Sequence, residues 1–259
     1  MKIKSKIIGL LSLLLLAGLH VSTANALVIN ENFNSPTSNV TYNGNAFQDL
    51  GNGWAVLTPN LQGQVGSLWF NTPFSLNNFS VSFDFFVGSN TGGADGITFS
   101  VIDTSLGLGT IGASGGGMGH VNMGGPSFTV EFDTWFNSGL GDPNDNHVQL
   151  AGNEGAGTLF GPNNGSIPTL EDGLVHSATI LFRSPASVQV FLDGALVLDS
   201  FFLPGMIPSS GYFGFTGGTG AANNLQYVDN VIFAIPEPAT LALLGLALAG
   251  LGFSRRKLH

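Results

Sequence analysis

Carboxylate, amide and imidazole side chains gather in one stretch of the sequence, residues 130–147, which reads Val-Glu-Phe-Asp-Thr-Trp-Phe-Asn-Ser-Gly-Leu-Gly-Asp-Pro-Asn-Asp-Asn-His. Glu131 and Asp133 alternate with apolar residues of high β-propensity, so both carboxylates should point to one face of a strand. The Gly-, Asn- and Pro-rich residues that follow predict a loop, and a second strand begins near His147. Two carboxylates on one face repel each other, and this predicts a compensating partner.

The loop returns further ligand types to that strand. Asn137 and Asp142 supply oxygen atoms, and His147 supplies an imidazole. Oxygen ligands suit a calcium-like ion, whereas a mixture of carboxylate and imidazole suits a manganese-like ion. The alternative is a solvated acidic hairpin loop, because Asp-Pro-Asn-Asp at 142–145 is ordinary turn chemistry. The residues alone leave both interpretations open.

The same stretch resembles the metal-binding strand and loop of the legume lectins, the L-type or concanavalin A-like family. In that family Glu-x-Asp is followed by Asn, Asp and His with closely similar spacing. The resemblance implies a Ca²⁺ site and a site for Mn²⁺ or another divalent transition metal, with two shared carboxylates. It implies that calcium is held by Asp133, the Trp135 carbonyl, Asn137 and Asp142, and the transition metal by Glu131, Asp133, Asp142 and His147.

A glycine-flanked carboxylate carries the resemblance into a predicted sugar site. Read alone, Ala94-Asp95-Gly96 is a turn in which Asp95 caps the local backbone. Beside the metal stretch it is similar to the Ala-Asp-Gly motif of the family. The resemblance then implies a cis Ala94–Asp95 peptide bond and an Asp95 carboxylate that accepts hydrogen bonds from two sugar hydroxyls.

Two further loops are expected to contribute backbone and small side chains. Gly115-Gly-Gly-Met-Gly119 is either a flexible linker or, by resemblance, a loop in which the N–H of Gly116 or Gly117 donates to a sugar hydroxyl. Residues 211–233 look like the last two strands of the family. The loop between those strands would contact the sugar through Ala221 and Ala222.

Two residues of the metal loop complete the predicted sugar site. The side-chain amide of Asn137 can donate to a hydroxyl while its oxygen binds calcium. An aromatic ring is usually needed against one sugar face, and Phe136 is the predicted platform. Trp135 is the alternative, although it could equally belong to the core.

Export signals are predicted at both ends of the chain. Residues 1–26 have three lysines, a short apolar run and Ala24-Asn25-Ala26, as in a cleaved signal peptide. Residues 236–259 join Pro-Glu-Pro, an apolar run and Arg255-Arg-Lys257, and are similar to the PEP-CTERM sorting signal of Gram-negative bacteria. That resemblance implies export to the cell envelope, a C-terminal hydrophobic helix held temporarily in the inner membrane, and processing by an exosortase-type enzyme before extracellular or surface display. A permanent C-terminal anchor is the alternative.

Residues 27–235 are predicted to form one all-β domain. Runs at 80–87, 176–183, 187–192 and 195–201 alternate or are continuously apolar between turns, and Asp193-Gly194 predicts a two-residue hairpin. This pattern favours a sandwich or jelly roll. The lectin resemblance implies the concanavalin A-like jelly-roll β-sandwich, with the metals under loops of a front sheet. Members of that family often pair their back sheets, so a homodimer is a further expectation.

The predicted domain is strongly acidic. Of the 7 Lys and Arg residues, all but Arg183 lie in the two terminal signals, while 15 of the 16 Asp and Glu residues lie in the domain, which gives a net charge near −14. Such a charge disfavours nucleic acid and anionic membrane surfaces as partners. The chain contains no cysteine, so the core must be stable without disulfides, and bound metal would help.

The predicted function is calcium-dependent binding of a glycan or exopolysaccharide without catalysis. Two alternatives stay open. Glycan hydrolases share the concanavalin A-like fold, but a retaining hydrolase needs two carboxylates about 5–5.5 Å apart, and Trp135 stands where the resemblance would require the second Glu. A structural surface or biofilm-matrix protein that keeps the fold without sugar binding would carry the same export signals.

Overall fold

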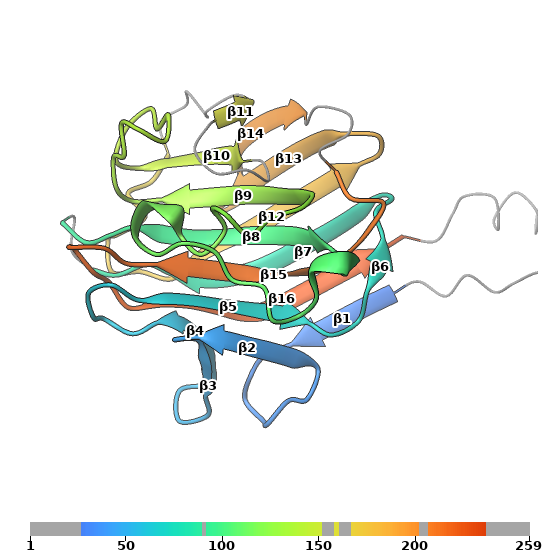
Figure 1. The fold of residues 1–259 in the computed structure, drawn as a ribbon, viewed down its shortest axis with the longest axis horizontal. Helices are drawn as coiled ribbons and strands as arrows, with labels where there is room; N and C mark the ends of the chain where they lie inside the picture. The colour runs from blue at the N-terminus through green and yellow to red at the C-terminus, as the bar shows by residue number, and fades with distance from the viewer. Residues whose placement is uncertain (1–26, 90–91, 152–157, 161–166, 202–206, 237–259) are drawn as a thin grey trace, which may run out of the picture. The chain divides into compact units, whose positions relative to one another are not determined.

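Two antiparallel sheets pack face to face in the computed structural model (Figure 1): strands of one alternate between buried and more exposed residues, and the central strands of the other are buried on both faces. The structure describes residues 27–89, 92–151, 158–160, 167–201 and 207–236. The predicted signal peptide and the predicted C-terminal helix lie outside these ranges. Within them, no helix is both long enough and apolar enough to cross a membrane.

One sheet, called the back sheet, contains the strands β1 (Leu27–Glu31), β3 (Phe47–Asp49), β4 (Trp54–Thr58), β7 (Phe79–Phe86), β12 (His176–Arg183), β13 (Ser187–Leu192), β14 (Ala195–Phe201) and β16 (Gln226–Ile235). Its strand order is β14-β13-β12-β7-β16-β4-β3, and β1 pairs with β16. Because β7 lies beside β12 and β16, which follow it much later in the sequence, this sheet is held by long-range pairing.

The other sheet, called the front sheet, contains β2 (Val40–Gly44), β5 (Val65–Phe70), β6 (Phe74–Ser75), β8 (Gly96–Asp103), β9 (Ser127–Asp133), β10 (His147–Ala151), β11 (Thr158–Phe160) and β15 (Ser210–Gly218). Its order is β11-β10-β9-β8-β15-β5-β2, and β6 pairs with β15. Two short 3-10 helices, η1 (Thr104–Leu106) and η2 (Gly115–Gly117), lie in the connection from β8 to β9.

Phenylalanine rings fill the space between the sheets. Along β7, Phe79, Val81, Phe83 and Phe85 are buried and alternate with residues that face away from the core, as a period of two requires. Phe83 meets Phe215 of the front sheet edge to face at 4.7 Å. Such aromatic pairs contribute about 0.5–1.5 kcal/mol beyond their buried area. The two sheets therefore form one core that needs no disulfide.

The opposite face of the front sheet is also buried, and it is polar. Hydroxyl groups link neighbouring strands across it: Thr98 bonds Thr216 at 2.7 Å, and Ser100 bonds Thr129 at 2.9 Å. The β8–β9 connection lies over this face, since Thr216 donates to the Met118 carbonyl at 2.6 Å. Glu131 and Asp133 of β9 also point to this covered polar face, because they alternate with the core residues of the strand.

The all-β sandwich expected from the sequence is confirmed, and so are its local details. The strands β12, β13 and β14 match the predicted runs, and β7 begins one residue earlier than predicted. Asp193 and Gly194 both have positive φ, 50° and 80°, as a type I′ hairpin requires. β9 ends at Asp133, so Trp135 and Phe136 belong to the loop rather than to the strand.

Replacing Phe213 by alanine should destabilise the domain by about 3–5 kcal/mol, because a fully buried ring leaves a cavity that a packed core fills poorly. Phe213 stacks on Phe233 across the two sheets with ring centroids 4.0 Å apart. Urea unfolding gives the free energy of unfolding. Phe47→Ala is the matched control, because that ring is 46% exposed. Equal losses in the two variants would contradict this account of the core.

Candidate functional site

Strand register places the predicted ligands side by side. β9 and β10 are antiparallel, with His147 opposite Asp133 and Gln149 opposite Glu131. Residues two apart in a strand share a face, so all four side chains lie on the same side of the front sheet. The loop between the strands then brings Asp142 to this group. Alternation along each strand predicts which side chains share a face, and the register between β9 and β10 brings the two groups of side chains together.

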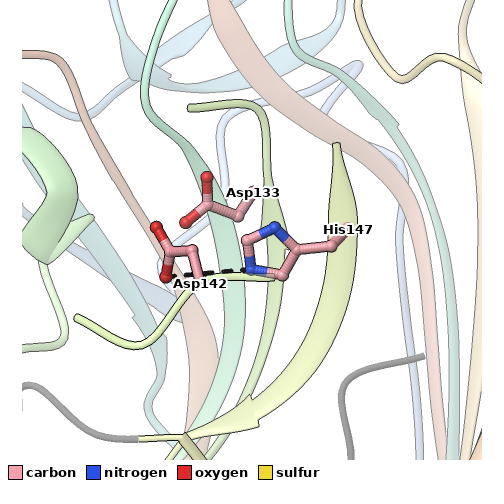
Figure 2. A group of neighbouring side chains, drawn as sticks. All are labelled: Asp133, Asp142 and His147. Carbon is pink, nitrogen blue, oxygen red and sulfur yellow. Dashed lines mark ion pairs between the residues drawn. The ribbon is translucent and has the colours of Figure 1, made fainter. Parts of the chain in front are cut away.

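Three of the predicted metal ligands converge in the structure. Asp133, Asp142 and His147 are buried, and one potential ligand atom from each lies within 4.8 Å of the others. Figure 2 shows the two carboxylates and the imidazole ring facing one another, and His147 Nε2 lies 3.9 Å from Asp142 Oδ1. Carboxylate oxygens with one imidazole nitrogen are the donor set that suits a divalent transition metal.

The tautomer of His147 fits a ligand role. Its Nδ1 lies 2.9 Å from the Asn144 carbonyl oxygen, so Nδ1–H donates there and Nε2 keeps its lone pair. Nε2 is buried and has no hydrogen-bond partner among the described residues. Burial also lowers the pKa of His147, which favours the neutral imidazole that binds metals.

The loop folds around the carboxylates and leaves an amide oxygen without a partner. The Asn137 N–H donates to Asp142 Oδ2 at 2.6 Å, and the Trp135 N–H donates to Asp133 Oδ1 at 2.7 Å. Asn137 Oδ1 is buried and unpaired within the described part of the chain. An unpaired buried oxygen is costly, and a cation beside Asp133 and Asp142 would satisfy it.

The electrostatics of the cluster also favour a bound cation. Burial, followed by the neighbouring Glu131 and Asp142 carboxylates, raises the pKa of Asp133 well above its usual range. In the sequence of residues 27–235 the only permanently positive side chain is Arg183. It is the exposed last residue of β12. Like charges buried together are stable when a bound cation offsets them. The residues present therefore fit a divalent metal.

Glu131 has its own partners in this structure. His120 Nε2 lies 2.6 Å from Glu131 Oε1, and Gln149 Nε2 donates to Oε2 at 2.5 Å. Burial alone would raise the pKa of Glu131, but His120 and Gln149 hold it below its usual value. Both carboxylate oxygens are thus oriented, next to the group formed by Asp142 and His147.

Asp95 lies on the neighbouring strand end and reaches the same region. The Ala94–Asp95 peptide bond is cis, as the resemblance implied. The Asp95 N–H donates to the Gly218 carbonyl, and Gln226 Nε2 donates to the Ala94 carbonyl at 3.2 Å, so the backbone is held on both sides. Burial raises the pKa of Asp95 to about 6. Its Oδ2 atom is buried without a partner in the ranges that the structure describes.

Two glycine loops approach these side chains closely. A Cβ on Gly116 would lie 2.4 Å from Asn137 Oδ1, and one on Gly220 would lie 3.3 Å from Asp95 Oδ2. Gly117 faces the other way, since its N–H donates to the Ser114 carbonyl and an added Cβ would meet Ala113. Backbone thus approaches Asp95 and Asn137 where a side chain would fill the space.

The remaining predicted contact residues lie at the surface of the domain. Trp135 and Phe136 are 40% and 50% exposed, so Trp135 is not part of the core and both rings are available at the surface. Ala221 is exposed and Ala222 is half-buried, in the loop that follows β15. Their side chains are small and follow Gly220 in the same loop.

Comparisons with known proteins identify the family of this chain. A family model of the legume lectin beta-barrel domain matches residues 30–231. The chain belongs to the legume lectin family. Its members bind carbohydrates without catalysis, and they bind Ca²⁺ with a transition metal, generally Mn²⁺. A second model, of the PEP-CTERM protein-sorting motif, matches residues 234–257, and this motif indicates export and sorting to the cell envelope.

Solved legume lectin structures share the fold of this lectin-family chain. The metal-free form of lectin I-B4 from Griffonia simplicifolia is 20% identical with a TM-score of 0.69, over 82% of this chain and 100% of that one. A Bauhinia forficata lectin in complex with GalNAc is 21% identical with a TM-score of 0.68, over 81% and 98%. Winged bean acidic lectin complexed with methyl-α-D-galactose is 19% identical with a TM-score of 0.67, over 81% and 98%.

Sequence reasoning missed three residues that support the site. Gln149 shares the face of His147 because it lies two residues further along β10, so strand periodicity could have found it. Gln226 and His120 gave no such signal. Each comes from a segment distant in sequence and meets the site through tertiary packing: Gln226 holds the Ala94 carbonyl, and His120 contacts Glu131.

A buried carboxyl group also lies behind the loop that carries Ala221 and Ala222. Glu171 is buried, and Asn224 Nδ2 donates to its Oε1. Burial raises the pKa of Glu171 from 4.5 to about 7. The folded protein therefore binds this proton more tightly than the unfolded chain does, and stability due to Glu171 falls as the pH rises from about 4.5 through 7.

Replacing Glu171 by glutamine should remove that pH dependence. At pH 4 the variant and the parent should be equally stable, whereas at pH 8 the variant should be more stable by up to about 3 kcal/mol, because it does not bury a charge. Urea unfolding in EDTA at both pH values measures the difference. Asp199→Asn, at an exposed carboxylate on β14, should show no such change with pH. A variant less stable than the parent at pH 8 would contradict the assignment.

Proposed function

We propose that this chain is an exported glycan-binding protein whose binding site depends on calcium and a second divalent metal, with no catalytic role. The observation that carries the proposal is the convergence of Asp95 and Asn137. Each has a buried side-chain oxygen that is unpaired among the described residues, and backbone of one glycine loop lies against both: a Cβ on Gly115 would lie 4.0 Å from Asp95 Oδ2, and one on Gly116 would lie 2.4 Å from Asn137 Oδ1. A hydroxyl group of a polyhydroxylated ligand can satisfy the unpaired Asp95 oxygen, and a calcium ion can satisfy the unpaired Asn137 oxygen.

In this proposal the metals organise the loop. Calcium is held by Asp133, the Trp135 carbonyl, Asn137 and Asp142, and Mn²⁺ or another transition metal by Glu131, Asp133, Asp142 and His147. The bound cations supply positive charge that offsets the buried carboxylates. Asp142 accepts the backbone N–H of Asn137, and this hydrogen bond positions Asn137 beside the ligands that would hold calcium. This chain's residues do the recognition, and the cations keep them in place.

The sugar is recognised by a short set of groups. Asp95 Oδ2 accepts from hydroxyl groups, the Asn137 amide N–H donates, and the N–H of Gly116 donates from the facing loop, since Gly117 uses its own N–H in the backbone. Phe136 or Trp135 packs on the apolar face of the ring. Ala221 and Ala222 shape the edge of the site.

The PEP-CTERM motif supports an activity outside the cytoplasm. We propose that the PEP-CTERM segment brings the chain to an exosortase-type enzyme in the inner membrane, where its hydrophobic helix is held before release. An exopolysaccharide at the cell surface is then the natural glycan partner, and the acidic domain favours a neutral polysaccharide over an anionic one. The back sheet would serve as the homodimer surface.

Asp95→Asn should weaken glycan binding about tenfold to a hundredfold, because hydrogen bonds to a charged acceptor contribute about 1.5–3 kcal/mol. The measurement is a glycan array with Ca²⁺ and Mn²⁺, repeated in EDTA, followed by titration calorimetry with the best ligand. Asp199→Asn is the control with an exposed carboxylate. No glycan bound by the parent in any condition would refute the proposal and favour a structural matrix protein.

Asp133→Asn should stabilise the protein in EDTA and destabilise it, relative to the parent, when Ca²⁺ and Mn²⁺ are present. In EDTA the variant should be more stable than the parent, because it removes a buried like charge next to Glu131 and Asp142. With Ca²⁺ and Mn²⁺ the parent should gain about 2.7 kcal/mol at one hundred times the dissociation constant, and the variant should gain little. Thermal unfolding in both buffers tests this crossover. The same metal-induced gain in the parent and in the variant would exclude Asp133 as a ligand.

A further inference from the structure

One carboxamide stands between two of the proposed metal ligands. Gln149 is 3% exposed and lies on the face of β10 that carries His147. Its Nε2 atom donates to Glu131 Oε2 at 2.5 Å and to Asp142 Oδ1 at 3.4 Å. A single N–H₂ group therefore bridges the two carboxylates that would otherwise share a cation.

The other end of this carboxamide lacks a partner. Gln149 Oε1 is buried and accepts no hydrogen bond from any residue that the structure describes. His147 Nε2, also unpaired within those residues, points toward the same Asp142 oxygen that Gln149 approaches (Figure 2). Two potential ligand atoms are thus unpaired close to this position: His147 Nε2 near Asp142, and the Oε1 atom at the far end of the Gln149 carboxamide.

Rotation about the last side-chain bond exchanges the two ends of a carboxamide with little change in shape. With no cation present, the N–H₂ end faces the carboxylates and reduces their repulsion. With a cation between them, that end would be repelled, and the oxygen end would be attracted. The same side-chain position therefore serves both states, and the orphaned oxygen gains a partner in the second.

We propose that Gln149 is a ligand of the transition-metal site, which binds the cation through Oε1 after its carboxamide turns over. The inference rests on the proposed function, because it needs a second cation beside the calcium site. Gln149 adds a neutral oxygen to the set of Glu131, Asp133, Asp142 and His147, and leaves fewer positions for water. His120, 2.6 Å from Glu131 Oε1, is a positioning residue that turns the Oε2 atom toward Gln149.

The decisive experiment is calorimetric titration of Mn²⁺ into the calcium-loaded full chain. Gln149→Met keeps the length of the side chain but removes both polar atoms. It should weaken Mn²⁺ binding tenfold or more while the calcium affinity stays within twofold. Gln189→Met is the matched control, because Gln189 also bonds an aspartate from within a strand, but on the back sheet. This control should bind both ions as the parent does.

Two outcomes would overturn the inference. Unchanged or tighter Mn²⁺ binding by Gln149→Met would show that the carboxamide only competes with the cation. A parent protein that binds calcium and glycan but no second ion would refute the inference and leave calcium-dependent glycan binding intact. If the parent binds neither ion, the proposed metal requirement fails as well.

A structural measurement keeps the test valid if the variant does not fold. Crystals of the parent protein grown with Mn²⁺, with data collected at the manganese absorption edge, locate the ion directly. The inference expects Gln149 Oε1 at about 2.2 Å from the ion. A water molecule in that position, with the carboxamide turned away, would overturn it. Circular dichroism in EDTA reports whether Gln149→Met is folded.

Discussion

Buried negative charge without a permanent positive partner is the constraint on which the site depends. Glu131, Asp133, Asp142 and Asp95 meet at one end of the front sheet, and burial together with their mutual repulsion raises the pKa of Asp133 and of Asp95. Within residues 27–235 the sequence supplies a single arginine, on another strand. In the proposed function a divalent cation would offset this charge, and the oxygen and nitrogen atoms that gather there suit such an ion.

Packing between the two sheets offsets the cost of burying these carboxylates. A core of interlocked phenylalanines holds the sheets together, so the opposite face of the front sheet is free to carry threonine hydroxyls and, further along β9, carboxylates. The register of β9 against β10 then sets which polar residues meet. Because the scaffold is stabilised by packing elsewhere, the metal loop can be organised for recognition rather than for stability.

The proposed metal centre and the proposed sugar site share Asn137, so the two sites would be linked. Asn137 donates its N–H to Asp142 while its side chain faces the Gly116 backbone, and Thr134 in the same loop donates to the Asp95 carbonyl. The carboxylate cluster is therefore connected to Asn137 and Asp95 through one or two hydrogen bonds. Gln149 extends this logic, since one carboxamide can balance the carboxylates or join their cation.

The sequence by itself determined the elements and the ligand types. Alternation predicted β12 to β14 and Asp193-Gly194 predicted the hairpin, because these signals are local, while the resemblance to the legume lectins pointed to Asp133, Asp142 and His147, which the structure brings together. Tertiary structure alone decided that His120 reaches Glu131, that Gly116 rather than Gly117 faces Asn137, and that Trp135 is exposed. These features depend on contacts between segments that are far apart in the sequence, and such contacts leave no periodic pattern from which they could be predicted.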